Sequence, residues 1–456
     1  MSHFKWSARI LASLLVATVL LSGLAACGPT PTPVPPTAMP AAKPTTPPPT
    51  ATPAPAGPVV IRVSSWSNST EELGIYQQIA QAFYQKYPNI VVKIESIPDY
   101  NTKLLTLIAG GQAPDVMLIG PEWFQDYAKR DAFRPLDDFI ARDKFDASDI
   151  APGLLNMGKY GGKQYGLNKD YTTLVIYYNK KLFDAAGLPY PSDGWTWDTF
   201  KSYACKLTKK EGGKITQWGY GADVTWWGMW MPFAYLNGGK FWSSETLGTI
   251  NFGPDTKATL TDAKTAEGIQ KYADLALKDG CAVLRPGAEG AGGLFKSGKL
   301  AMALWGRWMT REMRNTPGLD WDVAPLPAGA QKANMILSAL WTISKNSQHP
   351  EEAWKFIQFF LSPEAQKINA ANGQAIPALT SLARSEFFLT PGQAPAHSEV
   401  YLDVVKDSYL MPVVPNFREI DATWGPAIDE ILAGKKTAAQ AFVAINDKIT
   451  TILHQK

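Results

Sequence analysis

The fold of this chain is decided by three runs of sequence, VVIRVSSW (59–66), IVVKIESI (90–97) and APDVMLI (113–119). All three are rich in β-branched and other apolar residues, which predicts strands. Apolar residues at helical spacing predict helices over 71–87 and 100–109, between the strands. Because strands that alternate with helices form parallel sheets covered on both faces, this segment predicts an α/β fold.

The same alternation resumes further along the chain. Strands are predicted at 174–179, 218–221, 301–304 and 336–344, with helices such as 265–278 and 350–361 between them. The 456 residues are too many for one compact core, so we predict two α/β lobes. In sheets of this kind ligands bind at the carboxyl ends of the strands.

The N-terminus has the features of an export signal. Lys5 and Arg9 precede an uncharged and mostly apolar run from Ile10 to Leu21, which is shorter than the ~20 residues of a transmembrane helix. Residues 1–26 are therefore predicted to be a signal peptide. Leu-Ala-Ala-Cys at 24–27 resembles the bacterial lipobox, whose cysteine is diacylated and becomes the mature N-terminus. The alternative is an ordinary cleaved signal with an incidental cysteine.

Residues 27–58 are predicted to be a tether. From Gly28 to Pro58 the sequence is nearly all Pro, Thr and Ala and holds 13 of the chain's 35 prolines. Proline favours extended polyproline II, so the segment behaves as a semi-rigid spacer. We expect an extracytoplasmic protein, anchored to the outer face of the cell membrane by a lipid on Cys27.

Charge and motifs exclude several classes of function. Removing Lys5 and Arg9 with the signal leaves 44 − 2 = 42 basic against 41 acidic residues, and no basic patch stands out, so no nucleic-acid partner is expected. The sequence has no catalytic motif, and its four His residues are not spaced as metal ligands. Carboxylate pairs at 137–138 and 351–352 are typical of loops or helix starts rather than of glycosidase acids. We therefore predict neither an enzyme nor a metal site nor a cofactor.

A series of short motifs resembles the family 1 extracellular solute-binding proteins, which serve bacterial ABC sugar importers. The motifs are, in order, VSSW (63–66), YPNIVV (87–92), LIAGGQAPDV (107–116), YGL (165–167), IYYNK (176–180), LFDAAGLP (182–189), WTWDTF (195–200), FKSGKLAMA (295–303), WGRW (305–308), PLP (325–327) and EEAWKF (351–356). Each motif is weak alone, and their consistent order over most of residues 59–380 makes the resemblance specific.

The resemblance implies a two-lobed periplasmic-binding-protein-like fold of the cluster type, with hinge strands between the lobes and a ligand cleft. Residues 59–168 and 330–376 would form lobe 1, and 169–329 and 377–456 would form lobe 2. The protein would be a monomer that captures a carbohydrate, more specifically an oligosaccharide, and delivers it to the membrane permease subunits of an ABC transporter. Three alternatives stay open: the same fold binding a glycerol phosphate, polyamine or peptide, a secreted carbohydrate-active enzyme, and a structural or adhesive lipoprotein.

The high tryptophan content is the most informative feature for a binding site. The chain has sixteen tryptophans, and fifteen remain after the signal is removed. A sugar ring has an apolar C–H face with hydroxyls around its edge, so its site needs aromatic platforms and polar groups at the perimeter. Candidate ligand-binding residues lie at strand ends, in the WWGMW cluster (226–230), in WGRW (305–308) and on hinge-like segments. They are Trp66, Glu122, Asp170, Tyr171, Trp226, Trp227, Trp230, Trp305, Arg307, Trp308, Trp341 and Asn372, with Asn416-Phe417-Arg418 as a further group.

Core packing is the alternative for each aromatic candidate, and a solvated surface position is the alternative for Arg307. At least one of Trp226, Trp227 and Trp230 should be exposed or in the cleft, because three residues so close cannot share one face. In the resembling family an aromatic after the glycine of WGRW stacks on the sugar, which favours Trp308. Trp341 stands where relatives usually have a small residue, so it is expected to reshape the cleft.

Cys205 and Cys281 are the only cysteines besides Cys27. An exported protein meets an oxidising compartment, and both residues fall in the predicted second lobe. We predict a disulfide between them, with two buried thiols as the alternative.

Overall fold

The computed structural model describes residues 57–66 and 70–455. The predicted signal peptide, the lipobox with Cys27 and the tether up to residue 56 lie outside these residues. The fold described below is that of the unit that begins at Gly57.

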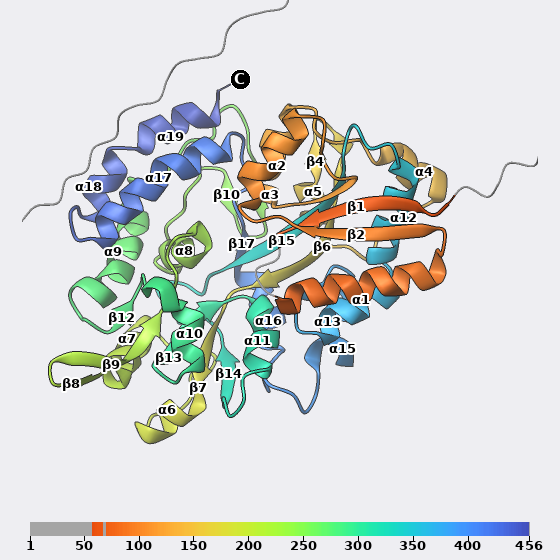
Figure 1. The fold of residues 1–456 in the computed structure, drawn as a ribbon. Helices are drawn as coiled ribbons and strands as arrows, with labels where there is room; N and C mark the ends of the chain where they lie inside the picture. The colour runs from red at the N-terminus through yellow and green to blue at the C-terminus, as the bar shows by residue number, and fades with distance from the viewer. Residues whose placement is uncertain (1–56, 67–69, 456) are drawn as a thin grey trace, which may run out of the picture. The chain divides into compact units, whose positions relative to one another are not determined.

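Seven strands form the first sheet (Figure 1). Their order is β16-β6-β15-β3-β1-β2, and β17 pairs with β15 off this path. The strands are β1 (Val59–Ser65), β2 (Ile90–Ser96), β3 (Val116–Ile119), β6 (Gly166–Thr173), β15 (Asn334–Ile343), β16 (Ile376–Pro377) and β17 (Ser408–Leu410). The predicted β-α-β-α-β opening is confirmed, because β1 pairs in parallel with both β2 and β3.

Six strands form the second sheet, in the order β12-β9-β13-β7-β14, with β8 paired to β9. They are β7 (Val175–Asn179), β8 (Lys209–Glu211), β9 (Lys214–Gly221), β12 (Ala282–Val283), β13 (Leu300–Trp305) and β14 (Trp321–Ala324). Two short antiparallel pairs stand apart, β4 (Lys159–Tyr160) with β5 (Lys163–Gln164) and β10 (Glu245–Thr246) with β11 (Thr249–Ile250).

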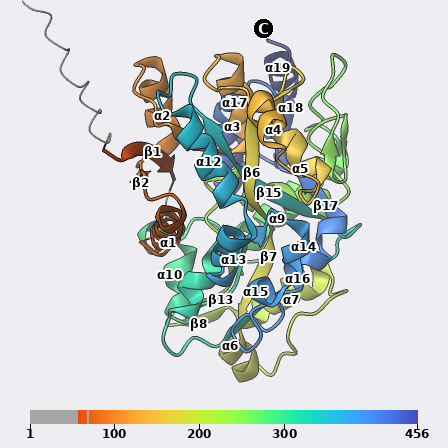
Figure 2. The ribbon, with the colours of Figure 1, turned by 90° about the vertical axis from the view of Figure 1, so that its right-hand side faces the viewer.

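Both sheets are mixed, so parallel pairing, which the alternation of strands and helices predicts, holds for only part of each sheet. In the first sheet β15 runs antiparallel to β3 and β6, and in the second β7 runs antiparallel to β13 and β14. The cause is the connection between the sheets. The chain passes directly from β6 into β7, and from β14 through residues 325–333 into β15, without a crossover helix (Figures 1 and 2). A strand reached without such a crossover is free to run antiparallel to its neighbours.

Helices cover both sheets. Those used below are α1 (Thr70–Lys86), α2 (Tyr100–Ala109), α3 (Pro121–Lys129), α7 (Trp197–Leu207), α9 (Ala263–Leu277), α11 (Thr310–Arg314), α12 (Pro350–Phe360), α13 (Pro363–Ala371) and α17 (Phe417–Leu432), with the 3-10 turns η1 (Trp227–Met229) and η3 (Arg307–Met309). The others are α4 (Asp137–Asp143), α5 (Pro152–Met157), α6 (Lys180–Ala185), α8 (Met231–Leu236), α10 (Gly290–Lys296), α14 (Thr380–Ala383), α15 (Glu386–Leu389), α16 (Val400–Asp403), α18 (Ala438–Val443) and α19 (Asn446–Leu453).

Local sequence sets several helix starts. Thr196 and Ser362 accept hydrogen bonds from backbone N–H groups of α7 and α13, and Asp262 caps α9 in the same way. These caps satisfy N–H groups that would otherwise have no partner in the first turn. No helix in residues 57–66 and 70–455 combines the length and the apolar character needed to cross a bilayer.

The C-terminal segment contacts elements of both sheets. Strand β17 adds to β15 in the first sheet, although residues 377–456 were expected to follow the second lobe. Helix α17 packs against α3 as well as against α9. A strand of three residues has no recognisable period, so the sequence does not reveal this return.

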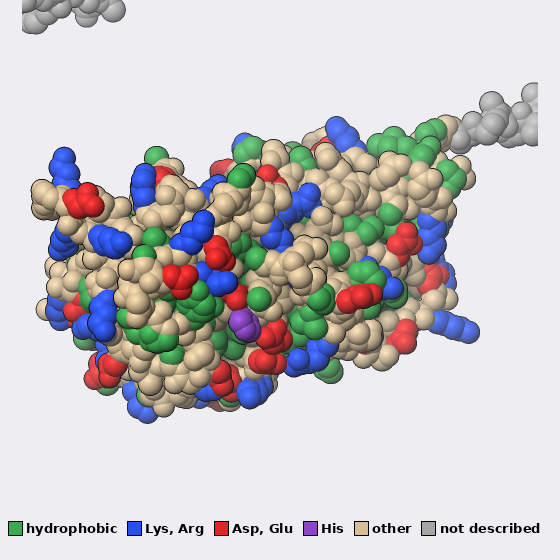
Figure 3. Space-filling view, turned by 90° about the horizontal axis from the view of Figure 1, so that it is seen from below, with side chains coloured by type: hydrophobic (Ala, Val, Ile, Leu, Met, Phe, Trp, Pro, Cys, Tyr) green, Lys and Arg blue, Asp and Glu red, His purple; other side chains and the backbone are tan. Residues whose placement is uncertain are grey.

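Basic and acidic side chains are interspersed on the face shown in Figure 3. No broad area of one sign is visible on that face. This distribution gives no electrostatic footprint for a nucleic acid there.

Cys205 of α7 and Cys281, just before β12, form a disulfide that joins positions 76 residues apart. Replacing both with Ser is expected to lower the free energy of unfolding by about 2–4 kcal/mol, because the unfolded chain regains the freedom that the cross-link removes. Urea unfolding of a Cys27→Ala protein with and without the two serines measures the difference. Thiol titration supplies the check: two free thiols in the denatured, unreduced Cys27→Ala protein would contradict the bond.

Candidate ligand-binding site

A pocket of about 360 Å³ lies where elements of the two sheets meet. The first sheet contributes the residues that follow its parallel strands: Trp66 after β1, Tyr100 after β2 and Glu122 after β3. The second sheet contributes Trp226 and Trp308. The remaining lining residues are Glu72, Asn101, Gly120, Trp123, Lys169, Asp170, Thr172, Leu337, Ser338, Ala339, Gln374, Ala375 and Met411. The pocket therefore occupies the carboxyl ends of β1, β2 and β3, where ligands of open α/β sheets bind.

Aromatic rings from both sheets line the pocket. The Trp66 ring lies edge-on to Tyr100, with centroids 5.5 Å apart, and the Tyr100 hydroxyl is held 2.8 Å from Ser64 Oγ. The indoles of Trp226 and Trp308 meet edge-on, with centroids 6.1 Å apart. Both tryptophans are partly exposed. These rings give the flat apolar surfaces on which the C–H face of a sugar can stack.

Glycine allows both indoles of the second sheet to lie close to the backbone. A β-carbon at Gly306 would overlap the Trp308 ring, and one at Gly228 would lie 2.5 Å from two carbons of the Trp226 ring. Any side chain at either position would displace the indole. Close packing of the two indoles against the backbone thus requires glycine at positions 228 and 306.

A buried ion pair forms part of the pocket wall on β6. Lys169 Nζ donates to Asp170 Oδ2 at 2.6 Å, and Asn369 Nδ2 donates to the same oxygen at 2.8 Å. The Lys169 ammonium also lies 5.4 Å from the centroid of the Tyr76 ring. The other carboxylate oxygen of Asp170, Oδ1, has no hydrogen-bond partner within the described chain. It can accept a hydrogen bond from a ligand hydroxyl.

Glu122 is a second carboxyl group in the pocket, in the first turn of α3. It is 9% exposed, and its Oε2 has no hydrogen-bond partner among the residues that the structure describes. Burial raises the pKa of Glu122 to about 8, and the nearby Asp421 carboxylate of α17 adds to the rise. At neutral pH the group therefore keeps its proton and can both donate and accept a hydrogen bond.

The third carboxyl group, Glu72 of α1, is already engaged. Its Oε1 accepts hydrogen bonds from the Tyr76 hydroxyl at 3.3 Å and from Gln374 Nε2 at 2.9 Å. In the described part of the chain no group of three or more His, Cys, Asp and Glu side chains is arranged to hold a metal ion. The pocket thus offers aromatic rings for stacking and polar groups for hydrogen bonds, so it is suited to bind a ligand.

Five of the twelve predicted ligand residues line this pocket: Trp66, Glu122, Asp170, Trp226 and Trp308. The structure brings them together from β1, α3, β6, η3 and the segment before η1. The other seven lie elsewhere.

Trp227 and Trp230 pack against α17 instead of lining the pocket. Trp227 meets Phe417 edge-on, and Trp230 meets Trp424 edge-on with centroids 5.3 Å apart. Both are buried. Helix α17 supplies an aromatic face that the local sequence around the WWGMW cluster cannot reveal.

Trp305, Arg307 and Trp341 are core residues. Trp305 packs edge-on against Tyr177 and Phe295, and Trp341, 1% exposed, packs edge-on against Tyr76, Phe356 and Phe360.

The Arg307 guanidinium is fully buried 4.0 Å from the centroid of the Phe388 ring, and it donates to Ser398 Oγ at 3.2 Å. Burial lowers its pKa to about 10. Arg307 still contributes to the site indirectly, because its backbone N–H donates to Thr172 Oγ1 at 3.1 Å. This bond ties the turn that carries Trp308 to β6.

Tyr171 and Asn372 also lie outside the pocket lining. Tyr171 lies between the lining residues Asp170 and Thr172, so alternation along the strand turns it to the other face of β6. Lys169 also lines the pocket because the register of β6 against β15 shifts at that residue. Asn372 bridges two helices instead: its Oδ1 accepts from Arg311 Nη1 at 2.6 Å, and its Nδ2 donates to Gln78 Oε1 at 3.3 Å.

Sequence reasoning missed Tyr100, Asn101, Trp123, Lys169, Gln374 and Met411. The rule that identified Trp66 extends to Tyr100 and Asn101, since they begin the helix α2 that follows the second strand after a three-residue turn. Gln374 and Met411 follow no strand pattern, and only the tertiary fold brings them to the pocket.

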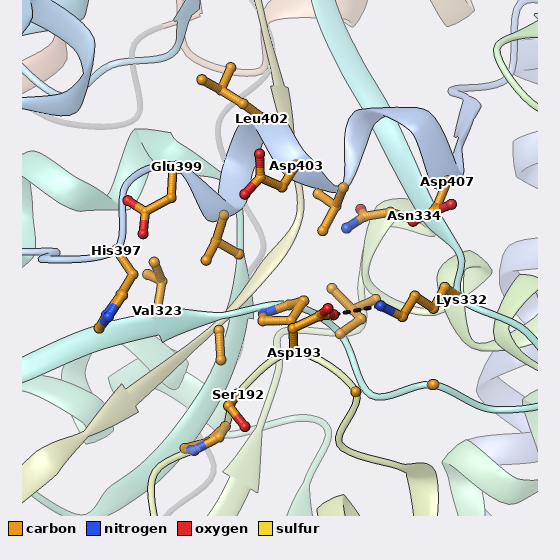
Figure 4. Close-up of a pocket in the computed structure, with 18 of the residues that line it drawn as sticks. Ser192, Asp193, Val323, Lys332, Asn334, His397, Glu399, Leu402, Asp403 and Asp407 are labelled. Carbon is orange, nitrogen blue, oxygen red and sulfur yellow. Dashed lines mark hydrogen bonds and ion pairs between the residues drawn. The ribbon is translucent and has the colours of Figure 1, made fainter. Parts of the chain in front are cut away.

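A larger cavity of about 930 Å³ lies between the second sheet and residues 399–407 (Figure 4). Lys332 and Asp193 form an ion pair in it, and its other labelled carboxylates are Glu399, Asp403 and Asp407. Besides His397, the aromatic rings among its described lining residues are those of Tyr178 and Tyr190. None of the predicted ligand residues lines it, and it lacks the facing indoles of the smaller pocket. The smaller pocket is therefore the candidate site.

Residues 66–367 match the sequence profile of the family described as bacterial extracellular solute-binding protein. This match covers well over half of the chain. The chain belongs to this family. Membership of a family of solute-binding proteins agrees with a pocket that offers stacking surfaces and hydrogen-bonding groups.

Similar proteins include other solute-binding proteins. The maltotriose-binding protein of Pyrococcus abyssi is 26% identical over 403 residues, covering 84% of this chain and 79% of that protein. The maltooligosaccharide ABC transporter solute-binding lipoprotein of Streptococcus pneumoniae is 24% identical, covering 85% and 89%. An ABC substrate-binding protein of Listeria monocytogenes, solved in complex with cycloalternan, has a TM-score of 0.78 and 27% identity, covering 88% of this chain and all of that one. The two-lobed α/β fold of the family is therefore the fold of this chain.

Proposed function

We propose that this solute-binding protein captures a carbohydrate in the 360 Å³ pocket and delivers it, as a monomer, to the permease subunits of an ABC importer. The observation that carries the proposal is the pairing of indoles from both sheets around buried carboxyl groups. Stacking surfaces and hydrogen-bonding edges are the two things that a sugar ring needs. The sugars named for the Pyrococcus, Streptococcus and Listeria proteins agree with this chemistry.

The charges of the pocket favour a neutral ligand. Among the lining residues that the structure describes, Glu72, Glu122 and Asp170 accompany one cation, Lys169, so a phosphorylated ligand such as a glycerol phosphate would meet carboxyl groups rather than a cluster of Arg and Lys. A polyamine needs unpaired carboxylates, whereas Asp170 is neutralised by Lys169 and Glu122 keeps its proton at neutral pH. Sugar hydroxyls, which donate and accept, suit this mixture best.

A thermal-shift screen tests the proposal, because a ligand that binds only the folded state raises the melting temperature. Neutral mono- and oligosaccharides are compared with glycerol 3-phosphate, spermidine and a tripeptide. We expect a rise with at least one neutral sugar and none with the other three compounds. A rise with spermidine or glycerol 3-phosphate alone would reject the carbohydrate assignment. New reducing ends after incubation with oligosaccharides would instead indicate an enzyme.

Trp308→Ala is expected to weaken sugar binding by roughly tenfold or more, since one stacking platform contributes on the order of 1 kcal/mol beyond its buried area. If residues 59–168 and 330–376 move as one lobe and residues 169–329 and 377–456 as the other, Trp66 and Trp308 stack on the sugar together only in the closed form. Calorimetric titration measures the change. Trp218→Ala, another partly buried tryptophan that does not line the pocket, is the matched control. Equal dissociation constants for the two folded variants would remove Trp308 from the site.

The anchor is tested separately from the pocket. We propose that Cys27 carries a lipid that holds the protein at the outer face of the membrane, as the lipobox resemblance indicates. Cys27→Ala is expected to move the protein from the membrane fraction to the soluble extracytoplasmic fraction, with its ligand affinity unchanged. Should the protein be processed and still sediment with membranes, the lipobox interpretation is wrong.

A further inference from the structure

A second cavity of about 90 Å³ adjoins the ligand pocket. The two share Asn101 and Trp123 as wall residues, so these side chains stand between them. The other residues that line the second cavity are Thr102, Leu105, Asp126, Tyr127, Arg130, Asn416, Arg418 and Glu419. They come from α2, from α3 and the residue that follows it, and from the start of α17 with the residue that precedes it.

Hydrogen bonds between these elements fix the walls of the second cavity. The Tyr127 hydroxyl donates to the Asn101 carbonyl at 3.0 Å, which ties α3 to α2. The backbone N–H of Arg418 donates to Asp126 Oδ2 at 3.2 Å, which ties α17 to α3. The Trp123 indole lies edge-on to Phe417, with centroids 6.0 Å apart. The cavity is thus framed by three helices that contact one another directly.

The charges in this cavity balance. Arg130 and Arg418 carry two positive charges, and Asp126 and Glu419 carry two negative ones. The described lining residues therefore show no excess of either sign that would favour an anion or a cation. A neutral group rich in hydroxyls gains guanidinium and amide donors and carboxylate acceptors beside an indole face.

We infer that the second cavity is a further sugar subsite, so that a neutral oligosaccharide runs from the main pocket past Trp123 into the cavity beside Arg130 and Arg418. The inference rests on the proposed function, because it extends the same ligand beyond the main pocket. It assigns Asn101, Asp126, Arg130 and Arg418 to ligand recognition. It also predicts that the site selects for chain length.

The test measures dissociation constants by calorimetry for three series of two to five units: linear α-1,4-glucans, β-1,4-glucans and β-1,4-mannans. For the series that binds, affinity should rise by roughly tenfold at the length that first reaches the cavity, since hydrogen bonds to charged groups are the stronger ones. Arg130→Ala/Arg418→Ala should abolish this increment and leave the shortest ligand unaffected. Both arginines are exposed, so the double variant is expected to fold.

Two controls keep the outcomes distinct. Arg384→Ala removes another exposed arginine, which lines the larger cavity, and should leave the whole length profile unchanged. Trp308→Ala should weaken every length by the same factor. A flat length profile in the unmodified protein, or an increment that survives in the double arginine variant, would overturn the subsite while leaving the proposed function intact. If no series binds and the wider sugar screen is also negative, the proposed function fails together with the subsite.

Discussion

Asp170→Asn is expected to lower the free energy of unfolding by about 3–5 kcal/mol, the cost of leaving one partner of a buried ion pair without the other. The side chains of Lys169 and Asp170 are only 5% and 7% exposed, and the Asp170 carboxylate also accepts from Asn369. Without the carboxylate, the ammonium stays buried above the Tyr76 ring. Denaturant unfolding at pH 7 measures the loss.

A double-mutant cycle separates this effect from a simple packing defect. Lys169→Met removes the other charge, and Lys169→Met/Asp170→Asn removes both. If the pair is coupled as the 2.6 Å contact indicates, the double variant should lose clearly less stability than the sum of the two single losses. Strictly additive losses would show that the two charges do not depend on each other.

Glu122 is expected to make the stability of the protein depend on pH. Its pKa is about 8 in the folded protein because the carboxyl group is buried, and near 4.5 when the chain unfolds and solvates it. Between these values the folded state holds a proton that the unfolded state has released. The folded state is therefore favoured most by this proton below about pH 4.5. As the pH rises to about 8, this contribution of Glu122 to the free energy of unfolding is lost.

Glu122→Gln removes this dependence, because the amide does not titrate and fills a similar volume. The free energy of unfolding of the variant minus that of the unmodified protein should increase by about 3 kcal/mol as the pH is raised from 5.5 to 8. Urea unfolding of both proteins across this range gives the difference at each pH, so other titrating groups cancel. A difference that does not change with pH would show that Glu122 ionises normally in the folded protein.

Much of the fold was predictable because its signals are local. The strands at 59–65, 90–96 and 116–119 carry β-branched runs, and the helices between them carry the helical period. Trp66 and Glu122 were identifiable as pocket residues from their positions after strands, since the topology of an α/β sheet fixes where strand ends meet. These features could be predicted because each depends on residues that are neighbours in the sequence.

The choice among the other candidates depended on tertiary packing. Nothing in the WWGMW cluster shows that α17, some 190 residues later, buries Trp227 and Trp230 and leaves Trp226 at the pocket. Trp341 likewise packs against aromatic side chains of α1 and α12, which only the folded sheet brings to it.

The sequence by itself therefore determined the fold class, the matched family and the strand ends that form the site. The tertiary structure alone decided which aromatic and polar side chains line the candidate pocket. The physical reason is that backbone pattern depends on neighbours in the chain, whereas burial of a side chain depends on helices distant in sequence that compete to cover it.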